Sequence, residues 1–103
     1  MLFSRDELYA CGEEGGNVAG IVTWDPTLSV ITWFQPGGRN RAYDVVEVIE
    51  DSDARFAFMD NQGRKFVLFP LTPDYYNAHI RRPRQPAYLT REALMQAYRA
   101  SLG

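Results

Sequence analysis

The sequence predicts a mainly β fold with some helix: a five-stranded antiparallel meander, closed into a small barrel or rolled sheet, with a short N-terminal helix and a C-terminal helix. Three observations predict it. Five short runs rich in β-branched and aromatic residues follow one another, residues that favour tight turns separate them, and a capped amphipathic pattern ends the chain. The five runs are Val18–Trp24, Leu28–Phe34, Tyr43–Glu50, Ala54–Asp60 and Lys65–Leu71.

The turns between these runs carry their own signals. Asp25 followed by Pro26 suits the first positions of a type I turn. The stretch Asp60–Gly63 suits a bulged hairpin in which Gly63 adopts a positive φ. Asp51–Asp53 forms the third polar turn. These connections are short enough to join antiparallel neighbours, so the runs form hairpins.

The last strand is apolar on both faces. Phe66 and Leu68 alternate with Val67 and Phe69, whereas a sheet that faces water on one side shows polar residues at every second position. Something therefore covers the second face of the sheet. The terminal helices are the first candidates and a partner molecule is the second.

We assign residues 1–103 to one domain, in which residues 1–17 form a helix and an acidic loop. Ser4 with Glu7 matches a capping box, and Gly12 suits the end of the helix. The acidic loop is then Glu13–Asn17. The competing interpretation is a strand over Leu2–Ala10.

After the meander of residues 18–71, we expect a short helix within residues 72–80, with Thr72 as its N-cap and Pro73 in its first turn. Residues 81–89 read as an extended basic connector, because prolines at 83 and 86 exclude a helix. Residues 90–103 form the final helix, capped by Thr90. Its predicted apolar stripe consists of Leu94, Ala97, Tyr98 and Leu102.

The net charge of −2 hides an uneven distribution along the chain: residues 1–60 carry −7 and residues 61–103 carry +5. This pattern indicates a dipolar molecule if the two parts occupy different faces. The first residues include Arg5, Asp6 and Glu7 where a signal peptide needs an apolar run, and no run has the roughly 20 apolar residues of a membrane span. We therefore expect a cytoplasmic protein without membrane association.

No residues stand out as catalytic, cofactor-binding or metal-binding. Cys11 and His79 are each the single residue of their type and lie far apart in the sequence. Glu47 and the acids of Glu50–Asp53 read as solvated side chains of a strand and a turn, and they lack the spacing of a calcium loop. We expect that the protein is not an enzyme and holds no cofactor.

Two arginine-bearing segments are the candidate partner-binding sites. The loop Gln35–Arg41 combines two glycines with arginines that recognise carboxylates or phosphates, although a mobile solvated loop is the simpler interpretation. The connector combines arginines with neighbouring tyrosines, although it also reads as a solvated linker. The candidate residues are Arg39, Arg41, Arg81, Arg82, Arg84, Tyr75, Tyr76 and Tyr88. Trp24 and Trp33 are alternative candidates for an aromatic cage, with core packing as the commoner role.

These features favour a non-enzymatic binding or regulatory module that recognises another macromolecule, foremost a protein. A small barrel that binds single-stranded nucleic acid is the alternative, and a small enzyme is the third hypothesis. The strand count is similar to that of SH3-like and Tudor-like barrels, and this resemblance concerns the fold alone. The oligomeric state stays open, a homodimer included.

Overall fold

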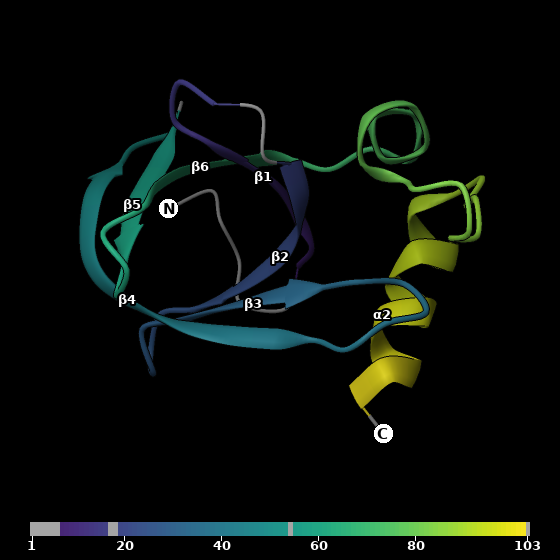
Figure 1. The fold of residues 1–103 in the computed structure, drawn as a ribbon, viewed down its shortest axis with the longest axis horizontal. Helices are drawn as coiled ribbons and strands as arrows, with labels where there is room; N and C mark the ends of the chain where they lie inside the picture. Colours follow the sequence, from purple (N-terminus) through teal and green to yellow (C-terminus); the bar gives the residue numbers. More distant parts are fainter. Residues whose placement is uncertain (1–6, 17–18, 54, 103) are drawn as a thin grey trace.

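The computed structural model describes residues 7–16, 19–53 and 55–102, which form a closed antiparallel barrel with helices packed on one side (Figure 1). The barrel has six strands, in the order of the sequence, and closes between its first and last strands. The mainly β barrel predicted from the sequence is therefore confirmed, with one strand more than expected. The strands are β1 Tyr9–Glu13, β2 Ala19–Asp25, β3 Val30–Phe34, β4 Arg41–Asp51, β5 Phe56–Asp60 and β6 Lys65–Pro70.

The additional strand, β1, replaces the later part of the helix predicted within residues 1–17. It pairs with β2 on one side and with β6 on the other, so that Tyr9 lies opposite both Val22 and Pro70. The helix prediction is wrong here because the side chains of β1 alternate between two apolar environments, a period that suits a strand. Gly12 lies within the strand rather than at a helix end. The predicted cap residue Ser4 lies outside the described residues.

The barrel interior is filled by the inward-facing side chains of all six strands. Aromatic rings dominate this core, and Phe58 contacts both Phe56 and Phe66 with ring centroids 6.2 and 5.6 Å apart. Its buried members are Tyr9, Cys11, Val22, Trp24, Ile31, Val45, Phe56, Phe58, Phe66 and Leu68. Trp33 and Tyr43 pack against this core but stay partly exposed.

A second core lies between the outside of the barrel and the helices that follow β6, so these helices cover part of the second face of the sheet, without the helix predicted within residues 1–17 (Figure 1). Its buried members are Leu8, Ala10, Ile21, Phe34, Leu71, Tyr76, Leu94 and Met95. The helices are α1 Pro73–Tyr75, the π-helical turn η1 Tyr76–Ile80 and α2 Arg91–Leu102.

The two helix starts predicted after the barrel, at Thr72 and Thr90, are confirmed. The Oγ1 atom of Thr72 accepts a hydrogen bond from the Tyr75 backbone N–H at 3.1 Å, and the Oγ1 atom of Thr90 accepts one from Ala93 at 3.1 Å. The predicted stripe of α2 needs a correction at its end, because Leu102 is 63% exposed and Met95 is buried instead. Across residues 7–16, 19–53 and 55–102, no helix combines the length and apolar character needed to cross a bilayer.

The connector between η1 and α2 contains no helix, as predicted, and it is tied back onto η1. The side-chain amide of Asn77 donates to the Tyr88 carbonyl at 2.7 Å and accepts from the Tyr88 N–H at 3.2 Å. The hydroxyl of Tyr76 donates to the Pro86 carbonyl at 2.8 Å. These bonds hold the arginine-rich stretch in a defined place rather than leaving it as a loose linker.

Candidate functional site

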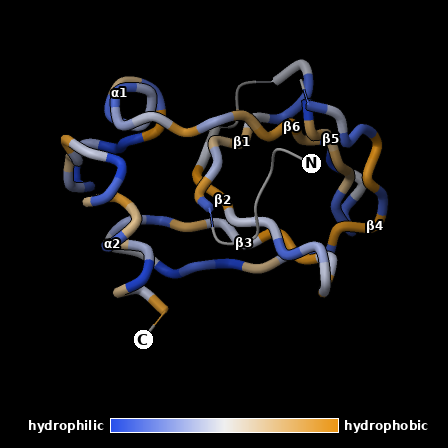
Figure 2. The backbone as a smooth tube through the Cα atoms, turned by 180° about the vertical axis from the view of Figure 1, so that it is seen from behind, coloured by the Kyte–Doolittle hydropathy of each residue, from blue (hydrophilic) through white to orange (hydrophobic). Residues whose placement is uncertain are grey.

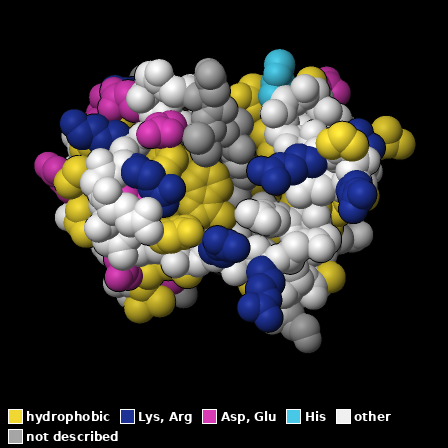
Figure 3. Space-filling model, viewed as in Figure 1, with side chains coloured by type: hydrophobic (Ala, Val, Ile, Leu, Met, Phe, Trp, Pro, Cys, Tyr) yellow, Lys and Arg dark blue, Asp and Glu magenta, His cyan; other side chains and the backbone are white. Residues whose placement is uncertain are grey.

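The residues with the strongest potential for recognition surround two adjoining cavities at one end of the barrel. The first lies at the mouth of the barrel, has a volume of about 180 Å³, and is lined by Trp33, Gln35, Arg41, Tyr43, Arg64 and Phe66. The second, of about 150 Å³, lies between the barrel and the helical side and is lined by Gly20, Ile21, Trp33, Phe34, Gln35, Pro36, Ile80, Arg82 and Gln85. Because Trp33 and Gln35 line both, the cavities form one surface, which we name the arginine groove. Figure 3 faces this end, with a hydrophobic patch bordered by dark-blue basic side chains.

Trp33 forms the wall between the two cavities. It lies on β3 opposite Val22 of β2 and Arg41 of β4. The edge of its six-membered ring lies against Gly20, where an added Cβ would sit only 2.4 Å from a ring carbon. Its other close neighbour is Phe66, met edge to face with ring centroids 5.4 Å apart. The glycine on β2 therefore makes the space in which the indole lies.

Arg64 forms a fixed wall of the mouth cavity. Its Nε and Nη2 atoms each lie 2.9 Å from the Oδ2 atom of Asp60, whose side chain is 1% exposed. The other carboxylate oxygen of Asp60 accepts the backbone N–H groups of Gln62 and Arg64 at 2.9 and 3.0 Å. The guanidinium consequently lies over the rings of Tyr43 and Phe66, at 5.5 and 5.4 Å from their centroids.

Arg41 and Arg82 differ from Arg64, the third arginine of the groove, because their guanidinium groups are not neutralised. Both side chains are exposed, and neither forms an ion pair with a carboxylate in the described part of the chain. By contrast, Arg55 contacts Glu14 at 2.7 Å and Glu50 at 3.3 Å. Arg41 and Arg82 therefore offer the groove two cationic hydrogen-bond donors that remain open to a ligand.

This arrangement suits an anionic, partly apolar ligand. A guanidinium fork matches the two oxygens of a carboxylate, and the surrounding ring edges and aliphatic groups provide apolar contact. The edge of the Trp33 ring lies against Gly20, and the guanidinium of Arg64 lies over the ring of Tyr43. A cationic ligand would meet Arg41, Arg64 and Arg82, so the groove disfavours it.

The structure brings together only part of the predicted site. Arg41 and Arg82, from the two predicted segments, line the same groove. Arg39, Arg81 and Arg84 are exposed but do not line it, and the Nε atom of Arg81 donates to the carbonyl of Gln85 at 2.9 Å.

The three predicted tyrosines lie elsewhere. Tyr76 is completely buried in the second core, so its prediction as a contact residue is wrong. Tyr88 is half-buried against Tyr76, with ring centroids 5.6 Å apart, and burial raises the pKa of both phenols. Tyr75 lines a separate cavity. Tyr76 and Tyr88 therefore attach the connector to η1.

Core packing, the commoner role expected for Trp24 and Trp33, is confirmed for Trp24, and these two residues do not form the alternative aromatic cage. Trp24 lies opposite Ile31, is 3% exposed, and packs against Phe56 with ring centroids 5.4 Å apart. In the mouth cavity, the lining residues that were not among the predicted contact residues are Gln35, Tyr43, Arg64 and Phe66. The sequence carries one indication of the position of Arg64, because Asp60 and Arg64 lie on the two sides of a recognisable turn.

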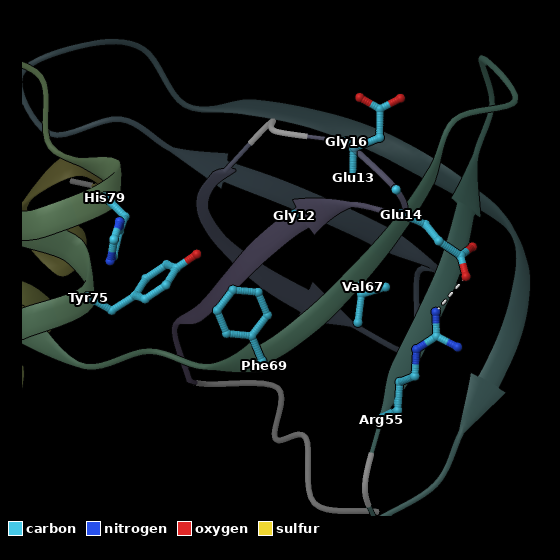
Figure 4. A pocket seen from close by; sticks show the side chains of 10 residues that line it. Gly12, Glu13, Glu14, Gly16, Arg55, Val67, Phe69, Tyr75 and His79 are labelled. Atoms are coloured by element: carbon cyan, nitrogen blue, oxygen red, sulfur yellow. Dashed lines mark hydrogen bonds and ion pairs between the residues drawn. The ribbon is translucent and has the colours of Figure 1, made fainter.

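A larger open cavity, of about 580 Å³, lies on the outside of the barrel between β6, the β1–β2 turn and the first helical segment (Figure 4). Phe69, Tyr75 and His79 form a run of rings along it, with successive centroids 5.2 and 4.8 Å apart. At its other end Arg55 is already paired with Glu14, and the Glu13 carboxylate points away from the rings (Figure 4). It therefore has no unpaired guanidinium like those of the arginine groove.

The two residues with potential nucleophilic or acid–base chemistry lie on opposite sides of the barrel wall. Cys11 is in the interior core, where burial raises the pKa of its thiol, and His79 is exposed on η1 outside. Within residues 7–16, 19–53 and 55–102, no group of three or more His, Cys, Asp or Glu side chains is placed to hold a metal ion. Comparison of the chain with family models, curated proteins and solved structures found no match.

Proposed function

We propose that this protein is a non-enzymatic binding module whose arginine groove takes an acidic segment of a partner protein. The observation that carries the proposal is the position of the unneutralised Arg41 and Arg82 on the two sides of Trp33. Bidentate guanidinium contacts hold carboxylates in a defined orientation, while the cavities beside Trp33 receive an apolar side chain.

The size of the cavities supports recognition of a peptide over a free cofactor or metabolite. At about 180 and 150 Å³, each is smaller than the roughly 300–1,000 Å³ of typical small-molecule sites. Each suits one side chain of a longer segment. Two adjoining cavities of this kind match a partner that places successive side chains along the groove.

Arginine next to aromatic residues is also the composition of surfaces that bind single-stranded nucleic acid, so this remains the alternative. Such surfaces stack bases on open ring faces. In the groove, the guanidinium of Arg64 lies over the ring of Tyr43, which takes a ring face away from base stacking. The acidic balance of the chain also repels phosphates. Both points favour a protein ligand.

The test is a binding titration with a fluorescein-labelled peptide that alternates Glu and Asp around a central Phe. The groove variant is Arg41→Ala with Arg82→Ala. The matched control is Arg39→Ala with Arg84→Ala, which removes the same charge from exposed positions that do not line the cavities. We expect the groove variant to weaken binding at least about tenfold, since each charge-assisted hydrogen bond contributes roughly 1.5–3 kcal/mol and exposure reduces this value.

An equal loss in both variants would mean that the peptide senses only the general charge of the surface, and the proposal would fail. A labelled oligothymidine supplies the comparison with nucleic acid. Tighter binding of the oligothymidine than of the peptide, with a steep loss of affinity as salt rises, would favour the nucleic-acid alternative.

A further inference from the structure

The second half of β4 has a neighbouring strand on one side only. β3 pairs with the first residues of β4, where Val30 lies opposite Asp44 and Trp33 lies opposite Arg41. β5 pairs with the remainder, from Val45 to Asp51. A hydrogen bond from the Val45 N–H to the Ser29 carbonyl, 2.8 Å long, is the last one that the described residues make on the β3 side. Beyond it, the described part of the chain places no strand against this edge of β4.

This edge is also unusually apolar for an exposed strand. Three large apolar side chains are exposed within four positions of β4: Val46 at 57%, Val48 at 43% and Ile49 at 43%. The other exposed large apolar residues in the described chain are far apart in the sequence: Leu28, Leu89 and Leu102. Two register shifts in the β4–β5 pairing, between Val45 and Glu47 and between Val48 and Glu50, place the extra residues of β4 here. Figure 2 shows the second half of β4 on the outer wall of the barrel, on the side away from the helices.

The charges along the edge have one sign. Asp44, Glu47 and Asp51 are exposed, and none of them forms an ion pair with a cation in the described part of the chain. Glu50 is the exception, because it contacts Arg55 at 3.3 Å. An open strand edge with aliphatic side chains and unpaired carboxylates is complementary to a strand that brings aliphatic and basic side chains.

We propose that the open edge of β4, from Val46 to Asp51, binds an extended cationic segment of a second partner protein. Basic side chains of that segment lie beside Glu47 and Asp51, and aliphatic side chains contact Val46 and Ile49. The bulges limit the backbone hydrogen bonds to a short stretch, so side chains supply much of the affinity. With the arginine groove at the barrel mouth, the protein would join an acidic partner to a basic one.

A second copy of this chain fits the edge less well. Antiparallel pairing of two copies about Val48 and Ile49 places Glu47 opposite Glu50 of the other copy. Like charges directly opposite each other across a strand pair are destabilising. The acidic residues therefore oppose self-pairing in this register, while they favour a basic strand in any register.

The test uses ¹⁵N-labelled protein and an alternating Val/Lys peptide of about eight residues, long enough for one strand. We expect amide shifts concentrated in residues 46–51. An alternating Val/Glu peptide should not bind, and N-methylation of every second amide of the Val/Lys peptide should weaken binding by removing hydrogen bonds along one edge. The double variant Glu47→Lys with Asp51→Lys should weaken binding about tenfold, and its urea midpoint checks that it folds.

Three results would overturn this inference: amide shifts that lie away from β4, equal binding of the Val/Glu peptide, or unliganded protein that dimerises through this edge in sedimentation analysis. The last result would identify a second copy as the occupant. The Arg41→Ala/Arg82→Ala variant separates the two proposals, because it should bind the Val/Lys peptide as well as the original protein does.

Discussion

The buried carboxylate of Asp60 offers a sharp test of how the arginine groove is built. In Asp60→Asn, the Oδ1 atom still accepts the N–H groups of Gln62 and Arg64, but an amide NH₂ replaces the Oδ2 atom that now accepts Arg64 Nε and Nη2. Two donors then face each other and the charge pairing is lost. Charge-assisted hydrogen bonds contribute roughly 1.5–3 kcal/mol, and exposed ion pairs about 0–1 kcal/mol.

The Asp60–Arg64 pair lies between these limits, because the side chain of Asp60 is 1% exposed and that of Arg64 is 41% exposed. We therefore expect Asp60→Asn to lower the free energy of unfolding by about 2 kcal/mol. Urea denaturation measures this value, and the Tyr43 ring resonances report whether the guanidinium leaves the ring. Asp53→Asn, at an exposed carboxylate, is the control. A loss below about 0.5 kcal/mol with unchanged Tyr43 resonances would refute the reasoning.

Three further predictions concern the barrel and its attachment to the helices. Gly20→Ala places a methyl group 2.4 Å from the Trp33 ring, so we expect a loss of about 1–3 kcal/mol in urea denaturation and a shifted Trp33 indole resonance; a silent substitution would contradict the packing described. Arg91→Ala removes the contacts of Arg91 with Glu7 and with the Leu71 carbonyl at 2.7 Å, and should lower the free energy of unfolding by about 1–2 kcal/mol. The control Arg99→Ala, at another exposed arginine of α2, should change the free energy of unfolding little. Burial raises the pKa of the Cys11 thiol, so the thiol keeps its proton in the folded state, whereas in the unfolded state it ionises near pH 8.5. The free energy of unfolding should therefore fall as the pH rises above about 8.5. Cys11 should also react with a thiol reagent only after the protein unfolds. Rapid labelling of Cys11 in the folded protein would contradict its place in the core.

The hairpins of the barrel were predictable because their signals are local. Asp60–Gly63 forms the expected turn, with Gly63 at φ 78°, and Thr72 and Thr90 cap helices where predicted. β1 was not predictable in the same way. Its partner β6 is remote in the sequence, and Gly12 locally resembles a helix end. Long-range pairing overrode the local pattern.

The sequence predicted the kind of residue that binds in the groove, but not which residues line it. Exposed arginines were expected in both segments, and Arg41 and Arg82 do line one surface. Which arginines meet there depends on how η1 and the connector pack against the barrel, and no local pattern contains that information. The burial of Tyr76 has the same origin, since its hydroxyl bonds to Pro86 only once the connector has folded back.

The most direct test follows the indole N–H resonances of Trp33 and Trp24 during titration with the Glu/Asp/Phe peptide. Trp33 lines both cavities, whereas Trp24 is 3% exposed inside the barrel and serves as an internal control. We predict that the Trp33 resonance shifts with the peptide, together with the side-chain Nε signals of Arg41 and Arg82, while the Trp24 resonance stays in place. A Trp33 resonance that does not move when the protein is saturated with peptide would contradict a partner-binding groove at the barrel mouth.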